Sequence, residues 1–557
     1  LLVLMFVGAF LEVLGVGMLP GFVAIIATPD RVFDVELLAP VLKYLNITDG
    51  GDLLVLGAIT LILVFLLKNG YLIFFRYIEA RFVFRRYASV GSQLFDRYMS
   101  APYSFSLARN SSELLRNVTS EAHLLISAVL SPALKMLKDA IMIAGIFLLL
   151  VFVEPLISLL VFILLGGAST LLLKALRNRM KSYGKQALLD RHMLIRAVNE
   201  GLGGLKDVIV LNRENWFVKR FNKHVNSYAR SQLFKQVAAG STKPVIETIA
   251  VGGMLGIALL LYLQGRSLEV IIPILTLFGA ATLRLMPAIQ EIVTCYNNLR
   301  YHIYSVEPVH RDLMELPVRT KDSSASGKLA FRNVIRFEQV GYHYPNANAQ
   351  AVDEINLSIR RGEAVGFVGP SGAGKTTLVD MLLALLEPQE GEITVDGTPI
   401  FENPSAWQRN VGYIPQFIFL SDDTIRRNIA FGLPDHEIDK EAVQSALEAA
   451  QLTDLIQDLE KGLDTVIGER GVRLSGGQRQ RIGIARALYH NPSVLIMDEA
   501  TSALDNVTEK YVIDAIEQFK GERTIVMIAH RLTTVQYCDM LYFMNDGRVT
   551  DQGTYED

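Results

Sequence analysis

The stretch "GPSGAGKTT" (Gly369–Thr377) decides the fold of the second half of the chain. It matches the pattern G-x-x-x-x-G-K-[ST], follows a strand-like apolar run (363–369) and precedes a helical one (378–386). Glycines at these places let backbone N–H groups close around phosphates, while Lys375 can reach the β- and γ-phosphates and the Thr376 hydroxyl can ligate Mg²⁺. The motif therefore predicts a nucleotide-binding α/β domain.

A second motif, "VLIMDE" (Val494–Glu499), follows later in the chain. Four apolar residues that end in an acid are typical of a buried parallel strand with a carboxylate at its C-terminal end. Asp498 is a candidate Mg²⁺ ligand there, and Glu499 is suited to be a general base that aligns an attacking water. The same pattern also fits an ordinary strand with a solvated end, so it does not decide the function alone.

The third motif is "LSGGQRQR" (Leu474–Arg481). It is a Gly-rich turn before a helix, and such a helix start is an anion site because its N–H groups are free and its dipole is positive. Together with the phosphate loop and "VLIMDEATSALD" (494–505), it resembles the nucleotide-binding domain of ABC transporters. The resemblance covers 329–557 and implies an α/β P-loop ATPase domain that uses ATP and Mg²⁺.

The resemblance also implies roles for single positions. Tyr344, which alone would fit a core strand, matches the aromatic residue that stacks on adenine; Gln416 matches the glutamine that senses Mg²⁺, and His530 the histidine that contacts the γ-phosphate. Glu469 matches the exporter loop that couples the two halves, and Asp505 the segment that communicates across a dimer. Catalysis is thus expected from Glu499, His530 and Gln416, Mg²⁺ binding from Thr376, Gln416 and Asp498, and nucleotide binding from Tyr344, Gly369, Ser371, Gly372, Ala373, Gly374, Lys375, Thr376, Thr377, Ser475, Gly476, Gly477 and Gln478.

The first half of the chain (1–306) is rich in apolar runs. Each run meets or approaches the ~20 residues that a helix needs to cross a bilayer. The first run extends to about Ala27, which favours a spanning helix over a signal peptide; the sequence begins at Leu1 rather than Met, which leaves open how much of the chain precedes it. The predicted spans are about 1–27, 53–75, 124–153, 156–174, 244–264 and 270–293.

Two long, Lys/Arg-rich connections, 76–123 and 175–243, are predicted to lie in the cytoplasm as helices that project beyond the membrane. Their bends, near 101–106 and 212–217, are where we expect the two halves of the chain to be coupled. The segment 30–47 has an apolar helical face and fits either an external interfacial helix or a helix packed on its own domain. A polar linker is predicted at 307–328.

The six-span half resembles the transmembrane domain of ABC exporters. One set of motifs and six spans imply an all-α membrane domain fused to an ATPase, a half-transporter that works as a homodimer. The resemblance implies a multi-pass protein of the bacterial inner membrane with a cytoplasmic ATPase domain. A net charge of −3 gives no case for a nucleic-acid partner, and the two cysteines form no metal motif or disulfide framework.

Three bases fall inside the predicted spans. Lys68, Lys138 and Arg284 lie 15 or 16 residues from an outer polar marker, which is roughly 22–24 Å of helix. Such charges usually face an interior or a water-filled path, so a basic ring around an anionic headgroup is one interpretation. The other is structural: Lys135 can pair with Asp139, Arg284 with Glu247 or Glu291, and long side chains can snorkel.

The sequence also suggests a specific class of substrate. The segment 283–302, "LRLMPAIQEIVTCYNNLRYH", and the segment 30–47 resemble bacterial flippases for lipid-linked oligosaccharides of the N-glycosylation pathway, which implies a polyprenyl-pyrophosphate oligosaccharide substrate. A multidrug or hydrophobic-peptide exporter and a lipid A or phospholipid flippase are the alternatives. An ATP-gated regulator or channel is disfavoured because Glu499 and "LSGGQ" are intact, and an uptake system because importers usually separate membrane and ATPase chains.

Overall fold

The computed structural model describes residues 1–27, 49–266, 268–316, 327–345, 347, 349–468, 471–499, 519–528 and 535–557. The chain divides into two units. The helical unit comprises Leu1–Met99 and Arg109–Val318, and the sheet unit comprises Ser100–Ala108 and Arg319–Asp557. The short segment around the first predicted coupling bend thus groups with the sheet unit rather than with the helices that flank it in sequence.

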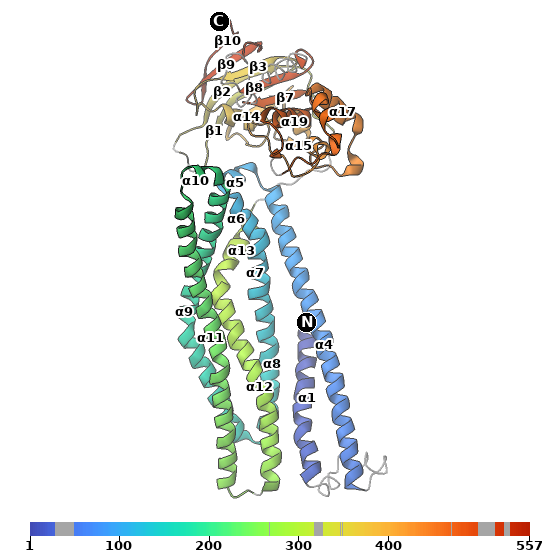
Figure 1. Ribbon diagram of the computed structural model, residues 1–557, viewed down its shortest axis with the longest axis vertical. Helices are drawn as coiled ribbons and strands as arrows, with labels where there is room; N and C mark the ends of the chain where they lie inside the picture. The colour runs from blue at the N-terminus through green and yellow to red at the C-terminus, as the bar shows by residue number, and fades with distance from the viewer. Residues whose placement is uncertain are drawn as a thin grey trace. The chain divides into compact units, whose positions relative to one another are not determined.

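The helical unit contains long helices that run side by side (Figure 1). Within the described residues, six helices are long and apolar enough to cross a membrane, as the apolar runs predict. The helices of this unit are α1 (Leu2–Ala27), α4 (Gly50–Ser100), α6 (Ser111–Arg116), η1 (Asn117–Glu121), α7 (Ala122–Leu124), η2 (Leu125–Leu130), α8 (Ser131–Val153), α9 (Pro155–Gly203), α10 (Leu205–Val210), α11 (Glu214–Leu263), α12 (Leu268–His302), η3 (Ile303–Ser305) and α13 (Val306–Glu315).

Three of these helices are much longer than a bilayer is thick. Helix α4 has 51 residues, α9 has 49 and α11 has 50, which is about 75 Å of helix each against a hydrocarbon core of about 30 Å. The charged connections therefore continue the spanning helices, as their apolar periodicity predicts. The turns at the opposite ends are short, and an ion pair between Arg266 and Glu154 joins two of them.

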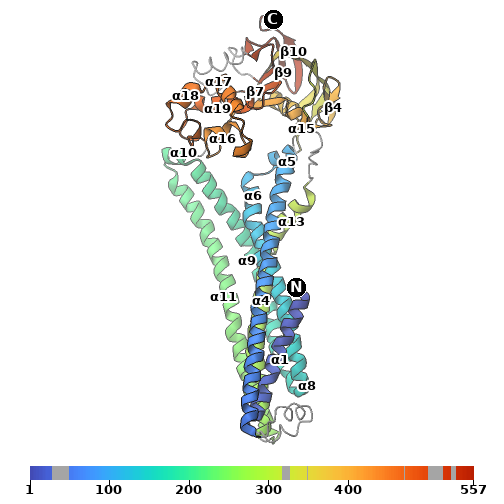
Figure 2. The ribbon, with the colours of Figure 1, turned by 90° about the vertical axis from the view of Figure 1, so that its right-hand side faces the viewer.

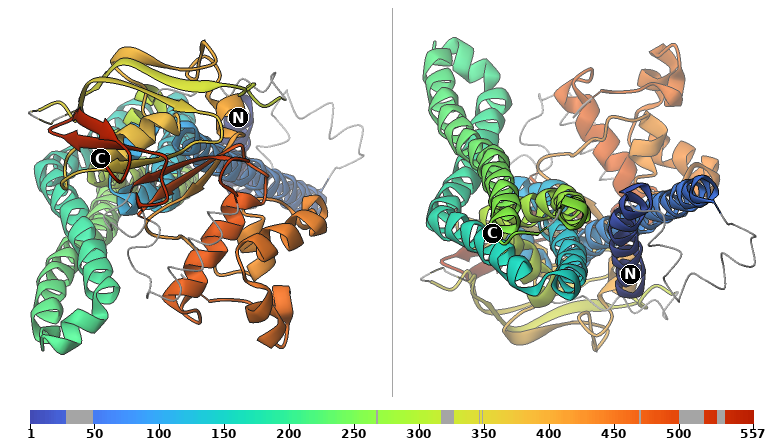
Figure 3. Two further views of the ribbon diagram at one scale, coloured as in Figure 1. Left: turned by 90° about the horizontal axis from the view of Figure 1, so that it is seen from above. Right: turned by 90° about the horizontal axis from the view of Figure 1, so that it is seen from below.

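Packing divides the helices into groups. Helices α9 and α11 lie against each other, visible end-on as the neighbouring green coils of Figure 3. A buried apolar cluster joins α1, α8, α11 and α12 through residues such as Val16, Ile146, Leu261 and Phe278. Helix α4 keeps a mostly apolar exposed face, with Leu66 and Leu67 about two-thirds exposed, as suits contact with lipid.

The predicted linker differs from the structure in its first part. Val306–Glu315 forms helix α13 and belongs to the helical unit, where Val309 is fully buried against Leu94 and Ala122. Val309 and Leu313 lie four residues apart on one helical face, so this short amphipathic stretch packs instead of remaining a loop. Residues 317–326 of the predicted linker lie outside the described residues, as does the amphipathic segment 30–47.

In its described residues the sheet unit contains two sheets, whose strands are drawn in Figure 2. One is antiparallel, in the order β2-β1-β4-β5; the other has the order β10-β9-β3-β8-β7-β6 and is parallel except for the β10–β9 pair. The strands are β1 (Val334–Tyr342), β2 (Val352–Arg360), β3 (Ala364–Val368), β4 (Glu390–Val395), β5 (Thr398–Pro399), β6 (Val411–Ile414), β7 (Val494–Asp498), β8 (Thr524–Ile528), β9 (Met540–Asn545) and β10 (Arg548–Gly553).

Helices cover the parallel sheet, so its inner strands are apolar throughout. Every residue of β7 and β8 is buried, which explains the continuous run "VLIM" that the sequence shows. The described helices of this unit are α5 (Tyr103–Ala108), α14 (Lys375–Leu382), α15 (Pro404–Gln408), α16 (Ile425–Ile429), η4 (Asp435–Glu437), α17 (Lys440–Ala449), α18 (Thr453–Asp458), η5 (Gly462–Asp464) and α19 (Gly476–Leu488).

Candidate nucleotide site and membrane pocket

The phosphate loop connects β3 to α14, as predicted. Its shape depends on glycine: Gly374 has φ +95°, and a Cβ there would lie 2.3 Å from the carbonyl oxygen of Ala351. A Cβ on Gly369 would lie 2.1 Å from the carbonyl oxygen of Met544. Neither position tolerates a side chain without moving backbone, so the loop stays tight enough for its N–H groups to converge on an anion.

Lys375 is buried at the first position of α14. Its Nζ donates to the carbonyl oxygens of Gly369 and Pro370, both at 2.8 Å, which holds the ammonium across the loop. Burial lowers the pKa of Lys375, while the charges of Glu499 and Asp498 act to raise it. The ammonium can therefore exchange these two carbonyls for phosphate oxygens. Ser371 and Thr376 are exposed beside it and accessible to a ligand.

Carboxylates gather at the end of β7. Glu499, with φ +46°, follows Asp498, and the Gln416 side-chain amide donates to the Glu499 carboxylate at 2.6 Å. Burial, reinforced by the charge of Asp498, raises the pKa of Asp380 to about 6. Asp380 lies on α14 one turn beyond the phosphate loop, and no role was predicted for it from the sequence. Its position as an acid within the apolar run "LVDMLL" could have drawn attention to it.

The oxygen donors of Thr376, Gln416 and Asp498 are of the kind that Mg²⁺ prefers. The structure brings the predicted Glu499 and Gln416 into direct contact, and Lys375 within the electric field of both acids of β7. Glu469, Asp505 and His530 lie outside the described residues. Their implied roles in coupling and γ-phosphate contact stay predictions.

Tyr344 lies next to the phosphate loop. Its hydroxyl is 3.2 Å from the Thr377 hydroxyl, and its ring meets Tyr342 edge-on with centroids 5.0 Å apart. Burial raises the pKa of Tyr344, so the phenol stays neutral. A neutral aromatic ring anchored to the loop that would hold phosphates is well placed for an adenine base.

The signature segment begins α19. Ser475 is its N-cap: the Ser475 hydroxyl accepts from the backbone N–H of Gln478 at 3.2 Å, and the Gln478 side chain accepts from the Ser475 N–H at 2.8 Å. This capping box leaves the first N–H groups of the helix, at Gly476 and Gly477, free for an anion. No contact recorded among the described residues joins this segment to the phosphate loop.

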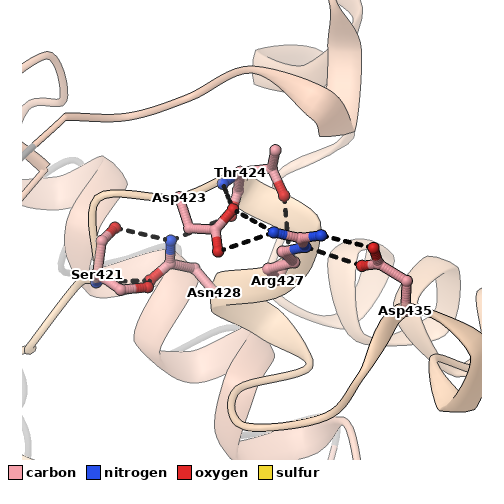
Figure 4. Close-up of polar contacts among 6 residues, drawn as sticks. All are labelled: Ser421, Asp423, Thr424, Arg427, Asn428 and Asp435. Atoms are coloured by element: carbon pink, nitrogen blue, oxygen red, sulfur yellow. Dashed lines mark hydrogen bonds and ion pairs between the residues drawn. The ribbon is translucent and has the colours of Figure 1, made fainter. Parts of the chain in front are cut away.

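A polar cluster orders the segment between Gln416 and α19 (Figure 4). Asn428 is fully buried; its side chain accepts from the Ser421 N–H at 3.0 Å and donates to the carbonyl oxygens of Ser421 and Thr424. Arg486 of α19 donates to the backbone oxygen of Asn428 at 2.8 Å. The exposed Arg427 instead forms ion pairs with Asp423 and Asp435 on the surface.

The helical unit contains a charged pocket of about 530 Å³. Four helices line it, α1, α4, α8 and α12. Its ionisable residues are Glu12, Arg76, Glu79, Lys135, Lys138, Asp139, Arg284 and Glu291. Of the three bases proposed as a ring, Lys138 and Arg284 are therefore at the pocket.

Lys68 is not part of the pocket lining. It is 1% exposed, packs its Nζ 4.4 Å from the Phe65 ring centroid, and donates to Glu12 Oε2 at 3.2 Å. Arg284 Nε reaches the same oxygen at 3.4 Å. The predicted ring thus differs from the structure because the sequence reasoning overlooked Glu12, an acid within an apolar span and a sufficient signal in itself.

The ion pairs of the other bases also differ from the pairs that the sequence suggested. Lys138 pairs with Asp139 at 3.3 Å, and Lys135 pairs with Glu291 at 3.1 Å rather than with Asp139. Arg284 meets Glu12 rather than Glu247 or Glu291. The pocket therefore contains paired charges of both signs, not a set of bare cations.

Comparisons with known proteins agree with this architecture. A family model described as ABC transporter matches 352–502, and one described as ABC transporter transmembrane region matches 37–284. Among curated proteins, the ATP-dependent lipid A-core flippase of Cupriavidus pinatubonensis is 31% identical over 467 residues, which cover 84% of this chain and 79% of the relative. The protein of the same name from Cupriavidus metallidurans is 32% identical, covering 83% and 78%.

A solved structure, a bacterial Atm1-family ABC exporter with ATP bound, shares the fold with a TM-score of 0.74. It is 24% identical and covers 99% of this chain and 95% of its own. The chain therefore belongs to the ABC transporter family: it is an exporter-type half-transporter that joins one helical transmembrane domain to one ATPase domain and couples ATP hydrolysis to transport.

Proposed function

We propose that this transporter is a flippase for a membrane lipid with a phosphorylated headgroup, of the lipid A type. The observation that carries the proposal is the charged pocket: Arg76 lines it, and Lys135, Lys138 and Arg284 could exchange their carboxylate partners for phosphate oxygens. An exporter of apolar drugs or peptides would need no such groups at membrane depth, where each charge costs roughly 2.5 kcal/mol or more. The names of the curated relatives favour the same class of substrate.

A polyprenyl-pyrophosphate oligosaccharide is the second candidate substrate. It would present a pyrophosphate to the same bases, and the segment 283–302 that suggested it contributes Arg284 and Glu291 to the pocket. The amphipathic segment 30–47, expected to engage its lipid tail, lies outside the described residues. The lipid A type is preferred because relatives over 30% identical across most of the chain have that name.

The ATPase step would use the residues around the phosphate loop. Mg²⁺ held by Thr376, Gln416 and Asp498 would neutralise phosphate charge. Glu499 would accept the proton of the attacking water, and the 2.6 Å bond from Gln416 fixes its carboxylate. Lys375 would leave its two carbonyl partners for the phosphates.

We also propose a homodimer in the bacterial inner membrane with the ATPase domain in the cytoplasm. The free N–H groups at Gly476 and Gly477 need an anion, and a second copy would supply bound ATP to them. The Lys/Arg-rich extensions of α4, α9 and α11 favour the cytoplasmic side for their long ends.

The test is ATP hydrolysis by the purified full chain in liposomes. A diphosphorylated disaccharide lipid, a polyprenyl-pyrophosphate glycan and a hydrophobic drug would be compared, using wild type, a Lys138→Gln/Arg284→Gln variant and Lys185→Gln. Lys185 is an exposed base of α9 away from the pocket. Stimulation by the disaccharide lipid that the double variant loses and Lys185→Gln keeps supports the proposal; stimulation by the drug alone refutes it.

A further inference from the structure

The pocket carries as many acids as bases. Its lining has Glu12, Glu79, Asp139 and Glu291 against Arg76, Lys135, Lys138 and Arg284, so its formal charge is zero. Three of the bases already have a carboxylate partner within 3.5 Å. A site for a purely anionic group would be expected to carry excess positive charge, and this one does not.

The remaining two charges lie one turn apart on α4. Arg76 is exposed and has no ion pair among the described residues. Glu79 is partly buried, and its Oε1 is buried without a hydrogen-bond partner in that part of the chain. A carboxylate oxygen that has lost water and gained no donor destabilises the protein unless a ligand supplies the donor. Lys135 lies within electrostatic reach of Glu79, but its ammonium donates to Glu291, so Glu79 can still accept a hydrogen bond from a cationic or N–H-bearing group.

The depth of these residues fits a headgroup. Glu79 lies 27 residues along α4 from Asp52, about 40 Å of helix, whereas Arg284 lies about 22 Å from its own outer marker. With a hydrocarbon core of about 30 Å, Arg76 and Glu79 lie at the inner interface and the Glu12–Arg284 pair lies within the core. A headgroup that enters from the inner leaflet would meet Arg76 and Glu79 first.

Charge exchange explains why both signs are present. A phosphate that takes Lys135 from Glu291 leaves a partly exposed carboxylate without its partner, and one that takes Arg284 from Glu12 leaves that buried carboxylate with Lys68 alone. An ammonium on the same headgroup can compensate that carboxylate. A group that carries both charges therefore replaces an internal ion pair without leaving either half uncompensated, which an anion alone cannot do.

We propose that the pocket recognises a zwitterionic headgroup, a phosphate ester that bears an amine, with Glu79 as the specificity-determining residue for the ammonium and Arg76 as its neighbour for the phosphate. The inference rests on the proposed lipid-flippase function and narrows its substrate. The amine-bearing phosphate could belong to a glycerophospholipid or to a phosphorylated sugar lipid, and the experiment separates these two sources.

The test uses two matched lipid pairs in proteoliposomes of the full chain. One pair is phosphatidylethanolamine and phosphatidylmethanol with identical acyl chains; the other is a disaccharide lipid phosphate with and without an ethanolamine cap. The measurement is the lipid concentration that half-saturates ATP-dependent flipping. We expect wild type to need about tenfold less of the amine-bearing member of at least one pair, the size of one charge-assisted contact. The pair that shows the preference identifies the source.

Three variants make the result specific. Glu79→Gln should abolish the preference while still flipping both lipids, Glu79→Asp should retain it, and Glu247→Gln should match wild type because Glu247 is a carboxylate of α11 away from the pocket. Equal flipping of both members by wild type, or a preference that survives in Glu79→Gln, overturns the inference and leaves the proposed function standing. No flipping of any of the four lipids overturns both.

Discussion

Glu12 on α1 holds two cations at once: its Oε2 lies 3.2 Å from Lys68 Nζ on α4 and 3.4 Å from Arg284 Nε on α12. Lys68 is almost completely buried, and Glu12 is 7% exposed. The lysine thus joins two spanning helices, while the arginine, 41% exposed at its side chain, is open to the pocket. Glu12 therefore pairs both with Lys68, which is buried between helices, and with Arg284, which a substrate in the pocket can reach.

This arrangement predicts how the unit responds to loss of either partner. Lys68→Met leaves Glu12 with Arg284 alone and should destabilise the protein by about 3 kcal/mol, the lower end for breaking a buried pair. The double variant Glu12→Gln/Lys68→Met removes both charges and should recover much of that loss. Thermal unfolding of the purified protein in detergent measures both. A double variant no more stable than Lys68→Met would contradict the pairing.

The position and shape of the phosphate loop were predictable from sequence because they depend on local residues. Gly369, Gly374 and Lys375 act through backbone shape within a few residues, so their spacing alone predicts a loop between β3 and α14. Gln416 and Glu499 follow the ends of β6 and β7, which are neighbours in a parallel sheet; both residues were named from the sequence, but their contact was not predicted. Asp380 was missed because its environment depends on the burial of α14, which no motif reports.

The membrane pocket was less predictable because helix rotation decides it. Depth along a helix is estimated from residue number, and Lys68 and Arg284, predicted at similar depths, do meet the same carboxylate of Glu12, while Lys138 lines the same pocket as Arg284. The direction in which a side chain points cannot be estimated in this way. Lys68 faces Glu12, whereas Arg76 and Glu79 on the same helix line the pocket. Lys135 and Arg284 have their partners on other helices, Glu291 and Glu12, whereas Lys138 pairs with its sequence neighbour Asp139, so sequence proximity predicts only some of the pairs.

Asp380 gives the ATPase domain a pH-dependent stability. Its pKa is raised to about 6 from an ordinary value of 3.8, so between these values the folded state keeps a proton that the unfolded state loses. Its contribution to stability falls as the pH rises through this window. Asp380→Asn should therefore stabilise the nucleotide-free protein above about pH 6 by up to about 3 kcal/mol, with a smaller gain near pH 5. Thermal midpoints at the two pH values test this.

Asp396 serves as a control because its pKa is shifted in the opposite direction from that of Asp380, so its effect on stability should have the opposite pH dependence. Burial acts to raise its pKa, but backbone N–H donors at Val334, Arg332 and Asn333 outweigh it and hold the pKa below its ordinary value. The stability that this carboxylate contributes is present above its unfolded pKa and is lost as the pH falls. Asp396→Asn should therefore lower the midpoint at neutral pH. If both variants shift the midpoint in the same direction at neutral pH, the assigned environments are wrong.

Two adjacent residues in Figure 4 should differ sharply in importance. Asn428 is fully buried and its side chain bonds to Ser421 and Thr424, so Asn428→Ala should cost about 3 kcal/mol by leaving several backbone groups unsatisfied. Arg427 forms ion pairs with two carboxylates, but they are exposed, so Arg427→Ala should scarcely change stability. Chemical denaturation of the two variants compares them, and the reverse order would refute this ranking.

Glu499 should separate ATP binding from ATP hydrolysis. Glu499→Gln keeps a side chain that can still meet Gln416, whose amide lies 2.6 Å from the present carboxylate, but it removes the basic oxygen. Loss of a positioned general base typically lowers a rate by about 10²–10⁴-fold, so hydrolysis should fall by that factor while nucleotide binding is retained. Lys375→Ala is the contrasting variant, since it removes the ammonium held 2.8 Å from the loop carbonyls and should weaken binding itself. Equilibrium binding of a fluorescent ATP analogue, measured beside phosphate release, distinguishes the two. Glu499→Gln would then trap nucleotide on the protein and stop lipid flipping without altering lipid affinity; hydrolysis at near wild-type rate in this variant would move the role of base to another residue.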